Sequence, residues 1–316
     1  MKKNYLITGG AGFIGSRLAE YLKYKKGSIY IIDDLSTGSL SNIKKLPKNI
    51  RFIKGDCAES EILKKLQKIK FDTIFHIAGQ SSGEISFDSP INDLNRNLVS
   101  TVKLAEFSLK NNVRKFVYAS SMSVYGDLKE DNFNAKEKSK CNPLSFYGIS
   151  KLTSENYLKT FSKLGLDVTI LRFFNVYGPN QNLKNLRQGM ISIYLGQLLK
   201  SNTIIVKGSL KRFRDFIYID DVVEAIIKIL KSNSVNGKIL NIGSGKCTQI
   251  KKIIKKIQTF VKQGLPQFGK IKLRKEENYK TFPSIKKAKI LLNWKPKISF
   301  DEGLLKTIKF YEKKIK

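Results

Sequence analysis

Residues 8–15 read T-G-G-A-G-F-I-G, and this stretch decides the fold. Residues 10–15 fit G-x-G-x-x-G, and Gly9 adds an overlapping G-x-x-G-x-x-G. A strand pattern precedes the glycines and a helical pattern follows them, which is the context that gives such a motif its meaning. Glycines there let backbone N–H groups approach a pyrophosphate at the positive end of a helix. The stretch therefore predicts a dinucleotide site, and this context disfavours the alternative of a glycine turn without a ligand.

Two acids follow the glycine loop at the distance such a site requires. Asp33 lies 18 residues after Gly15, at the end of the next apolar run, where an acid is expected to bind the adenosine ribose hydroxyls. Asp34 adds a second negative charge that would repel a 2′-phosphate, and we expect no arginine nearby to accept one. The sequence therefore favours NAD over NADP as the cofactor.

Short apolar runs alternate with amphipathic stretches over the first half of the chain. The pattern predicts strands over 4–8, 28–32, 51–54, 73–77, 115–119 and 168–173, and helices over 13–24, 60–68, 92–111 and 147–163. This alternation predicts an α/β protein with a Rossmann-type, doubly wound parallel sheet. Ligands bind such sheets at the carboxyl ends of the strands. The predicted strand ends carry Gly9, Asp33, Asp56, Gly79, Ser121 and Asn175.

The pattern changes after residue 174, where a smaller lobe is expected. A loop is predicted over 175–186, helices over 189–199, 222–230 and 300–311, and strands over 203–206 and 216–219. We assign residues 1–174 to an NAD-binding domain, with 215–240 packing back on it. Residues 175–214 and 241–316 are assigned to a smaller C-terminal α/β lobe that binds the substrate.

The composition excludes several classes of protein. Hydrophobic residues make up 41% of the 316-residue chain, enough for a large core, and no run approaches the ~20 apolar residues that span a bilayer. The three cysteines are far apart and have neither disulfide nor zinc spacing, so we expect no metal and a reducing cytoplasm.

The net charge of +33 raises the question of a polyanionic partner. Only nine of the 59 basic residues are arginine, and the lysines are dispersed over the chain. Lysine is the ordinary solvated cation, whereas arginine does most phosphate and base recognition. We therefore expect neither nucleic acid nor membrane insertion, although the charge should attract anionic substrates. A non-catalytic dinucleotide sensor or a nucleic-acid-binding protein is the remote alternative.

Candidate catalytic residues are few. His76 is the single histidine and lies in a predicted apolar strand, where it is expected to be a core group. Tyr147 and Lys151 lie four residues apart on a predicted helix, so they share a face. A neighbouring ammonium group is expected to lower the pKa of the phenol and make it a usable base near neutral pH. Ser121, in the serine-rich turn after a strand, could relay a proton between the substrate and the phenol; an ordinary surface helix and turn are the alternatives.

With these residues assembled, the chain resembles the extended short-chain dehydrogenase/reductase family, and within it the NAD-dependent nucleotide-sugar epimerases of the UDP-glucose 4-epimerase type. The resemblance covers nearly the whole chain. Its markers are T-G-G-A-G-F-I-G at 8–15, D-D-L-S-T-G at 33–38, G-D at 55–56, H-I-A-G at 76–79, S-S-M-S-V-Y-G at 120–126, Y-G-I-S-K at 147–151, R-F-F-N-V-Y-G-P at 172–179 and R-D-F-I-Y-I-D-D-V at 214–222.

The resemblance implies a role for each matching position. The catalytic residues would be Ser121, Tyr147 and Lys151. The substrate would contact Ser121, Ser123, Tyr147, Asn175, Met190, Arg214 and Arg274. The cofactor would contact Gly9, Gly12, Phe13, Ile14, Gly15, Asp33, Asp34, Ser36, Thr37, Gly38, Asp56, Cys57, Ile77, Ala78, Gly79, Gln80, Asn97, Ser120, Tyr147, Lys151 and Phe174.

The implied reaction is oxidation and re-reduction at C4 of a nucleotide-activated hexose, through a transient 4-keto sugar. The implied substrates are UDP-glucose and UDP-galactose or the N-acetyl forms, and the implied assembly is a homodimer. A 4,6-dehydratase, a 4-reductase and a decarboxylase of the same family are the alternatives. Dehydratases have an acid pair just after the catalytic hydroxyl, where this chain has Met122 and Ser123.

Some positions depart from the pattern of the family. The diphosphate arginine is followed by Lys275 and Glu276 without the usual glycine, and Met190 stands where many relatives have asparagine. Thr281 falls near the position that gates the sugar pocket. A small residue there is a hypothesis for acceptance of N-acetyl sugars.

Overall fold

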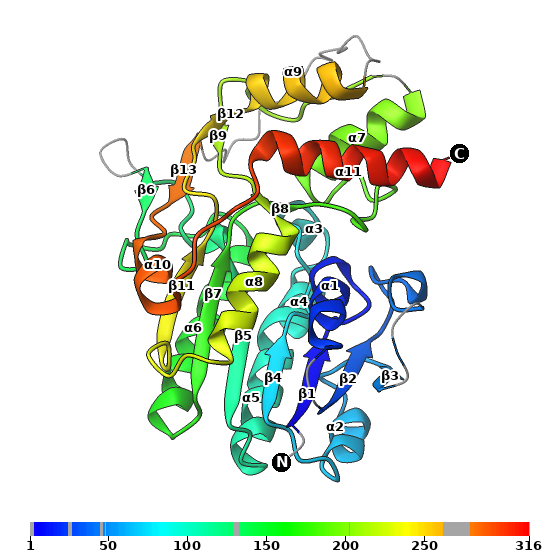
Figure 1. Cartoon of the computed structure of the whole chain (residues 1–316). Coiled ribbons are helices and arrows are strands. Elements are labelled where there is room, and N and C mark those ends of the chain that lie inside the picture. Colours follow the sequence, from blue (N-terminus) through cyan, green and yellow to red (C-terminus); the bar gives the residue numbers. More distant parts are fainter. Residues whose placement is uncertain are drawn as a thin grey trace.

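The central element is a sheet of seven parallel strands (Figure 1). The computed structural model describes residues 3–24, 27–44, 47, 49–128, 133–201, 203–261 and 279–315. The spatial order of the strands is β11 (Lys238–Ile242), β7 (Val168–Phe173), β5 (Lys115–Ser121), β4 (Thr73–His76), β1 (Lys3–Thr8), β2 (Gly27–Asp33) and β3 (Ile50–Lys54). The direction of strand succession reverses between β1 and β4, which opens a crevice at their carboxyl ends. The predicted doubly wound fold is confirmed.

Helices cover both faces of this sheet because successive strand residues point to opposite sides. Leu6 belongs to the apolar cluster under α2 (Ser60–Leu66), α5 (Ser100–Lys110) and α6 (Phe146–Lys163). Its neighbour Ile7 belongs to the cluster under α1 (Phe13–Leu22), α8 (Ile219–Ile229) and α10 (Lys286–Leu292). The strands β1, β4, β5 and β7 are therefore almost wholly buried, which explains their continuous apolar sequences.

The helix expected over 92–111 is interrupted. Two short helices, α3 (Gly83–Asp88) and α4 (Pro90–Leu94), precede a π-helical turn over Asn95–Val99, and α5 follows it directly. A π-turn inserts an extra residue into the helical repeat and is frequent at functional sites. This one brings the side chain of Asn97 to the buried side of the helix, against α6.

The smaller elements build a second layer above the carboxyl ends of the strands (Figure 1). Two short parallel strands, β8 (Val176–Tyr177) and β10 (Ile217–Tyr218), continue the chain out of the main sheet. A four-stranded mixed sheet has the order β12 (Thr248–Gln249), β9 (Phe213–Arg214), β13 (Lys280–Pro283) and β6 (Asn134–Ala135). Three helices complete this layer, namely α7 (Met190–Ser201), α9 (Ile250–Val261) and α11 (Phe300–Ile315). Two 3₁₀ turns, over Leu40–Asn42 and Met122–Val124, lie in loops of the main domain.

Two sequence predictions in this half are wrong. Residues 203–206 have the alternation of a strand, since Ile204 and Val206 are buried and Ile205 is half exposed, but they form no ladder. The Ile205 N–H donates instead to the side chain of Gln197 at 3.0 Å. Conversely, no strand was predicted over 238–242, where β11 pairs with β7 at the edge of the main sheet.

None of the helices in the described part of the chain is both long and apolar enough to cross a membrane.

Candidate active site

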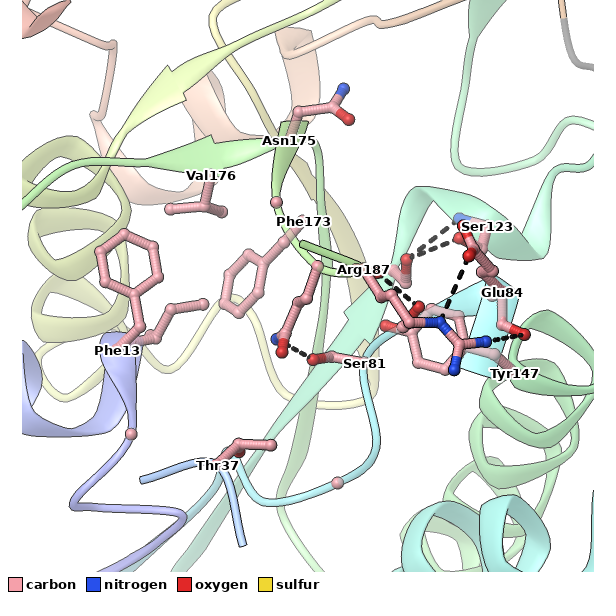
Figure 2. Close-up of a pocket in the computed structure, with 18 of the residues that line it drawn as sticks. Phe13, Thr37, Ser81, Glu84, Ser123, Tyr147, Phe173, Asn175, Val176 and Arg187 are labelled. Atoms are coloured by element: carbon pink, nitrogen blue, oxygen red, sulfur yellow. Dashed lines mark hydrogen bonds and ion pairs between the residues drawn. The ribbon is translucent and has the colours of Figure 1, made fainter. Parts of the chain in front are cut away.

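A large cavity, of about 1140 Å³, lies over the carboxyl ends of β1, β2, β4, β5 and β7. Figure 2 shows Phe13, Phe173, Asn175 and Val176 on one side of it and Ser123 and Tyr147 on the other. The residues expected at the strand ends are thus brought together. The predicted site residues that line the cavity are Gly9, Gly12, Phe13, Ile14, Asp33, Asp34, Ser36, Thr37, Asp56, Cys57, Ile77, Ala78, Gly79, Ser120, Ser121, Ser123, Tyr147, Lys151, Asn175, Met190 and Arg214.

The other predicted site residues do not line the cavity. Arg274 lies outside the described residues. Gly15, Gly38, Gln80 and Asn97 support the wall of the cavity from outside it. Phe174 was expected beside the cofactor, but its side chain is fully buried against Tyr125, whereas the neighbouring Phe173 faces the cavity. The alternation of side chains at the end of a strand accounts for this difference.

The glycine loop is shaped for close approach of a ligand to its backbone. Gly9 has φ +68°, and its N–H donates to Ile32 O at 2.8 Å, which ties the loop to β2. A Cβ on Gly15 would stand 2.2 Å from Gly9 O, so only glycine fits under the turn. Helix α1 starts directly after this loop, with no side-chain cap and no acid in its first turn. Its amide groups and positive end are therefore available to an anion.

The acid pair after β2 has two different environments. The buried carboxylate of Asp33 accepts the N–H groups of Ala11 at 2.9 Å and Leu35 at 2.8 Å, so it braces the glycine loop. Asp34 pairs with Arg96 at 2.7 Å. Burial acts to raise its pKa, but hydrogen bonds from Ser36 and the Arg96 guanidinium hold that pKa below its usual range. The expectation that no arginine lies near these acids is wrong, because the π-turn carries Arg96 to them from 62 residues away.

The candidate catalytic residues lie together and are nearly inaccessible to solvent. Ser121, Tyr147 and Lys151 are 8%, 7% and 4% exposed. The Lys151 Nζ donates to Ala119 O at 2.9 Å and lies 5.9 Å from the centre of the Tyr147 ring. Ser121 Oγ donates to Ser123 Oγ at 3.1 Å, within the 3₁₀ turn that faces the tyrosine. Helix α6 and the end of β5 thus hold all three groups in the wall of the cavity, with little of each side chain exposed.

The acidity of these groups differs from the sequence expectation. Burial raises the pKa of Tyr147 to about 12, although a hydrogen bond to Ser121 acts to lower it. Burial also lowers the pKa of Lys151 to about 8, against the opposing charges of Asp93 and Glu155. The predicted lowering of the phenol pKa by its ammonium neighbour is therefore wrong, because burial removes the hydration that a phenolate needs.

His76 is a core residue, as the sequence indicated. Its two ring nitrogens lie 2.8 Å from Thr8 Oγ1 and 3.0 Å from Thr101 Oγ1, and the ring is fully buried. Burial lowers its pKa to about 3, so it stays neutral and hydrogen-bonded at physiological pH. This excludes it as the general base of the cavity.

The far end of the cavity is basic. Arg214 lines it and is held by Phe213 O at 2.7 Å and Tyr279 O at 3.3 Å, while Arg212 and Lys207 stand beside it. Sequence reasoning chose Arg214 alone, although R-F-R at 212–214 was visible as a signal for both arginines. Thr281 pairs with Arg214 across the β13–β9 ladder, is fully buried, and does not line the cavity.

Sequence reasoning also missed an ion-pair cluster between the two layers. Arg187 binds Glu84 at 3.2 Å (Figure 2). Arg187 also binds Asp88 at 2.6 Å, and Lys207 binds Glu84 at 2.8 Å. The side chain of Gln188 also hydrogen-bonds Ser81. Residues 81–88 of the main domain thereby contact residues 187–207 above them across the cavity. No local pattern marks this cluster, since its partners are about 100 residues apart.

The cavity has the features that an NAD molecule needs. The glycine cradle beneath its pyrophosphate position admits no Cβ, and the Asn97 Oδ1 atom is buried without a hydrogen-bond partner in the described structure. The fold and the site together define an α/β enzyme that uses a dinucleotide. The comparisons agree, because residues 5–243 match the model of the NAD dependent epimerase/dehydratase family. The chain belongs to that family, and the predicted NAD dependence and family resemblance are confirmed.

The relatives of the chain act on nucleotide sugars. It is 34% identical over 309 residues to the putative UDP-glucose 4-epimerase of Methanocaldococcus jannaschii, covering 96% of both chains. The crystal structure of a Thermotoga maritima UDP-glucose 4-epimerase with UDP-glucose superimposes with a TM-score of 0.91 at 31% identity, covering 99% of this chain and 100% of that one. A UDP-N-acetyl-α-D-glucosaminuronate decarboxylase of Bacillus cytotoxicus is 30% identical, with 98% of both chains covered. These relatives are thus named for different reactions on nucleotide sugars.

Proposed function

We propose that this protein epimerises a nucleotide-activated hexose at C4 through a transient 4-keto sugar. The proposed substrates are UDP-glucose and UDP-galactose or their N-acetyl forms. One observation carries the proposal: buried Ser121, Tyr147 and Lys151 share a cavity with the glycine loop, and Met122 and Ser123 follow the catalytic hydroxyl. No carboxylate occupies those two positions, so the acid pair that elimination of water requires is missing there. The 31–34% identity to UDP-glucose 4-epimerases supports the same reaction.

The side chains divide the work of this reaction. Bound NAD supplies the acceptor and the donor of hydride. Tyr147 Oη takes the proton of the sugar C4 hydroxyl and later returns it, with Ser121 as the hydrogen-bonding bridge. The Lys151 ammonium group favours the phenolate while the proton is transferred, because its charge lies 5.9 Å from the ring centre. The low exposure of all three groups limits the access of water that would compete for the proton.

We further propose that the two layers divide the ligands between them. Residues 1–174 and 215–240 would hold the cofactor, whereas 175–214 and 241–316 would hold the sugar nucleotide. The support lies in the lining of the cavity, to which Asn175, Met190 and Arg214 contribute from above the sheet. An arginine suits the diphosphate because its planar fork matches two phosphate oxygens. Three free thiols, at Cys57, Cys141 and Cys247, are consistent with the reducing cytoplasm that we propose as its location.

The direct test is product analysis by NMR and mass spectrometry, with UDP-, TDP- and GDP-sugars as substrates and NAD added. We expect UDP-glucose and UDP-galactose to interconvert at constant mass with no net reduction of NAD. The acetylated pair tests whether the N-acetyl forms are substrates, although Thr281 is buried outside the cavity lining and is not expected to decide this. A loss of water would instead identify a dehydratase, a loss of CO₂ from a uronic acid a decarboxylase, and consumption of added NADPH a reductase. Any of these as the sole reaction would overturn the proposal.

We also propose that the protein is a homodimer formed through α4 and α6. These helices pack on each other and expose large apolar side chains, Ile91 at 70%, Phe146 at 41% and Ile149 at 48%. The ring of Phe146 also packs against the half-exposed ring of Phe87, with the ring centres 5.4 Å apart, so the apolar surface extends to Phe87. A monomer rarely leaves so large an apolar surface in water, and a second copy would cover it.

Replacing Ile149 with aspartate is expected to convert the dimer to a monomer, because the charge would be buried in the apolar interface. Light scattering during size-exclusion chromatography measures the mass directly. Ile290→Asp is the matched control, since Ile290 is 79% exposed on the distant α10 and should leave the mass unchanged. A wild-type protein that elutes as a monomer at micromolar concentration would contradict the proposal.

A further inference from the structure

Asp93 is a fully buried acid that neither lines the cavity nor belongs to any predicted site. It lies on α4, and its carboxylate accepts three hydrogen bonds from side chains of three other segments. The donors are Gln80 Nε2 at 2.8 Å, Asn97 Nδ2 at 3.1 Å and Ser150 Oγ at 2.8 Å. Burial acts to raise the pKa of Asp93, but these three hydrogen bonds all favour its ionised form, which only accepts. Asp93 is therefore the point where the loop after β4, the π-turn and α6 are joined.

Two hydrogen-bond partners of Asp93, Gln80 and Ser150, are next to residues that line the cavity. Gln80 binds the backbone of Ser82 with both ends of its amide, which shapes the loop over 79–82 that lines the cavity. Ser150 lies between Tyr147 and Lys151 on the same turn of α6. Asp93 therefore binds both Gln80, which shapes the loop over 79–82, and Ser150, which lies on the helical turn that carries Tyr147 and Lys151.

Asp93 also determines the orientation of the Asn97 amide. Because the Nδ2 group of Asn97 donates to Asp93, its Oδ1 atom must point the other way. The Asn97 Oδ1 atom lies so close to Gly79 that a Cβ on that glycine would stand only 2.5 Å from it. This oxygen has no hydrogen-bond partner among the described residues. The backbone of Asn97 is held as well, since its carbonyl accepts from Thr101 at 2.5 Å and Ser154 at 3.1 Å. These contacts keep the buried Asn97 Oδ1 atom facing Gly79, in the loop that lines the cavity.

The charges around Asp93 leave Lys151 as its electrostatic partner. From α6 it faces Lys151 and Tyr147, and Glu155 lies further along that helix, paired with Arg172. Arg96 of the π-turn is paired with Asp34 instead. The acids of α3, Glu84 and Asp88, are paired with Arg187. The negative charge of Asp93 raises the pKa of Lys151 and that of Tyr147.

We propose that Asp93 is a positioning residue for the reaction, whose carboxylate aligns the Gln80 loop, the Asn97 amide and the Ser150–Lys151 turn around the cofactor. The proposal rests on the catalytic role given above to Tyr147 and Lys151. Asp93 acts entirely through these neighbours, since it reaches neither the cavity nor the substrate.

The test is Asp93→Asn in the full-length enzyme. An asparagine at this position accepts through one oxygen only, and its NH₂ group would confront a donor. We expect kcat to fall by about 10–100-fold, as misplacement of a reacting group predicts, with KM for the sugar nucleotide changed less than about threefold. Loss of the negative charge should move the kcat–pH profile to lower pH by ~0.5–1 unit, because the pKa values of Lys151 and Tyr147 both fall. The affinity for NAD alone, measured by calorimetry, should fall as well.

Two further variants separate positioning from stability. Asp167→Asn removes a half-buried acid that pairs with Lys115 at the opposite end of the sheet, so it should lower the Tm without moving the pH profile. Ser150→Ala removes one donor and keeps the charge, so kcat should fall severalfold with the profile unchanged, and this variant serves if Asp93→Asn does not fold. Wild-type kcat, NAD affinity and pH profile in Asp93→Asn, or wild-type kcat in Ser150→Ala, would overturn the inference. An inactive wild-type enzyme would instead contradict the proposed function.

Discussion

Tyr147→Phe is expected to lower kcat for epimerisation by about 10²–10⁴-fold, the contribution typical of a positioned general base. The change removes one oxygen from a ring that is 7% exposed, so the ring should keep its place on α6. KM for the sugar nucleotide should change little, because the proton is transferred only in the transition state. Steady-state kinetics with product detection by NMR measures both constants.

The control for this substitution lies on the same helix. Tyr157→Phe makes the identical chemical change at a side chain that is 48% exposed and away from the cavity, and it should retain wild-type kcat. The purified Tyr147→Phe protein should still bind NAD, since the glycine cradle is untouched. Full turnover by Tyr147→Phe would show that the phenol is not the base, and His76 could not replace it, because its ring is buried and neutral.

The sequence predicted the parts of the site that depend on local geometry. The glycine loop, the strand ends and the four-residue spacing of Tyr147 and Lys151 each follow from a strand or helix repeat, and the structure brings all of them to one cavity. Most positions that the family resemblance implied could be located in the cavity, because each motif is a contiguous run of sequence. The core position of His76 was visible in the same way, from the apolar run around it.

What the sequence did not predict depends on contacts between distant segments. Arg96 reaches Asp34 over 62 residues, and Arg187 reaches Glu84 over 103. The predicted direction of the Tyr147 pKa shift was wrong for a related reason. Burial raises this pKa, and the burial is produced by several segments and not by the helix of Tyr147 alone. The segment over 203–206 shows the limit of periodicity, since its alternation reports which side chains are buried and not whether its backbone pairs.

The second large effect is a loss of folding stability on breaking the buried ion pair between Arg172 and Glu155. Arg172 and Glu155 form a two-pronged ion pair, with distances of 2.9 and 2.6 Å, and the two side chains are 2% and 0% exposed. Arg172→Met is expected to lower the free energy of unfolding by about 3–5 kcal/mol, because it leaves the buried Glu155 charge without its partner. Urea denaturation measures this as a lower midpoint at an unchanged m value.

A control substitution at an exposed arginine, Arg114, tests whether burial of the ion pair causes the large loss of stability. Arg114 pairs with Asp72 in the same bidentate manner, but it is 42% exposed, so Arg114→Met should cost less than about 1 kcal/mol. The double variant Arg172→Met/Glu155→Gln should recover most of the lost stability, since no unpaired charge is then left in the core. A loss below about 1 kcal/mol in Arg172→Met alone would contradict the argument.

The double variant also separates stability from function. Glu155 Oε1 accepts the hydroxyl of Ser120 at 2.6 Å, and Ser120 directly precedes the catalytic Ser121 at the end of β5. A glutamine at 155 can keep that hydrogen bond through its carbonyl oxygen. If the ion pair serves only the core, the double variant should be both stable and active. If it is folded but slow, the charge of Glu155 acts on the site itself, through the pKa of Lys151 that it helps to raise.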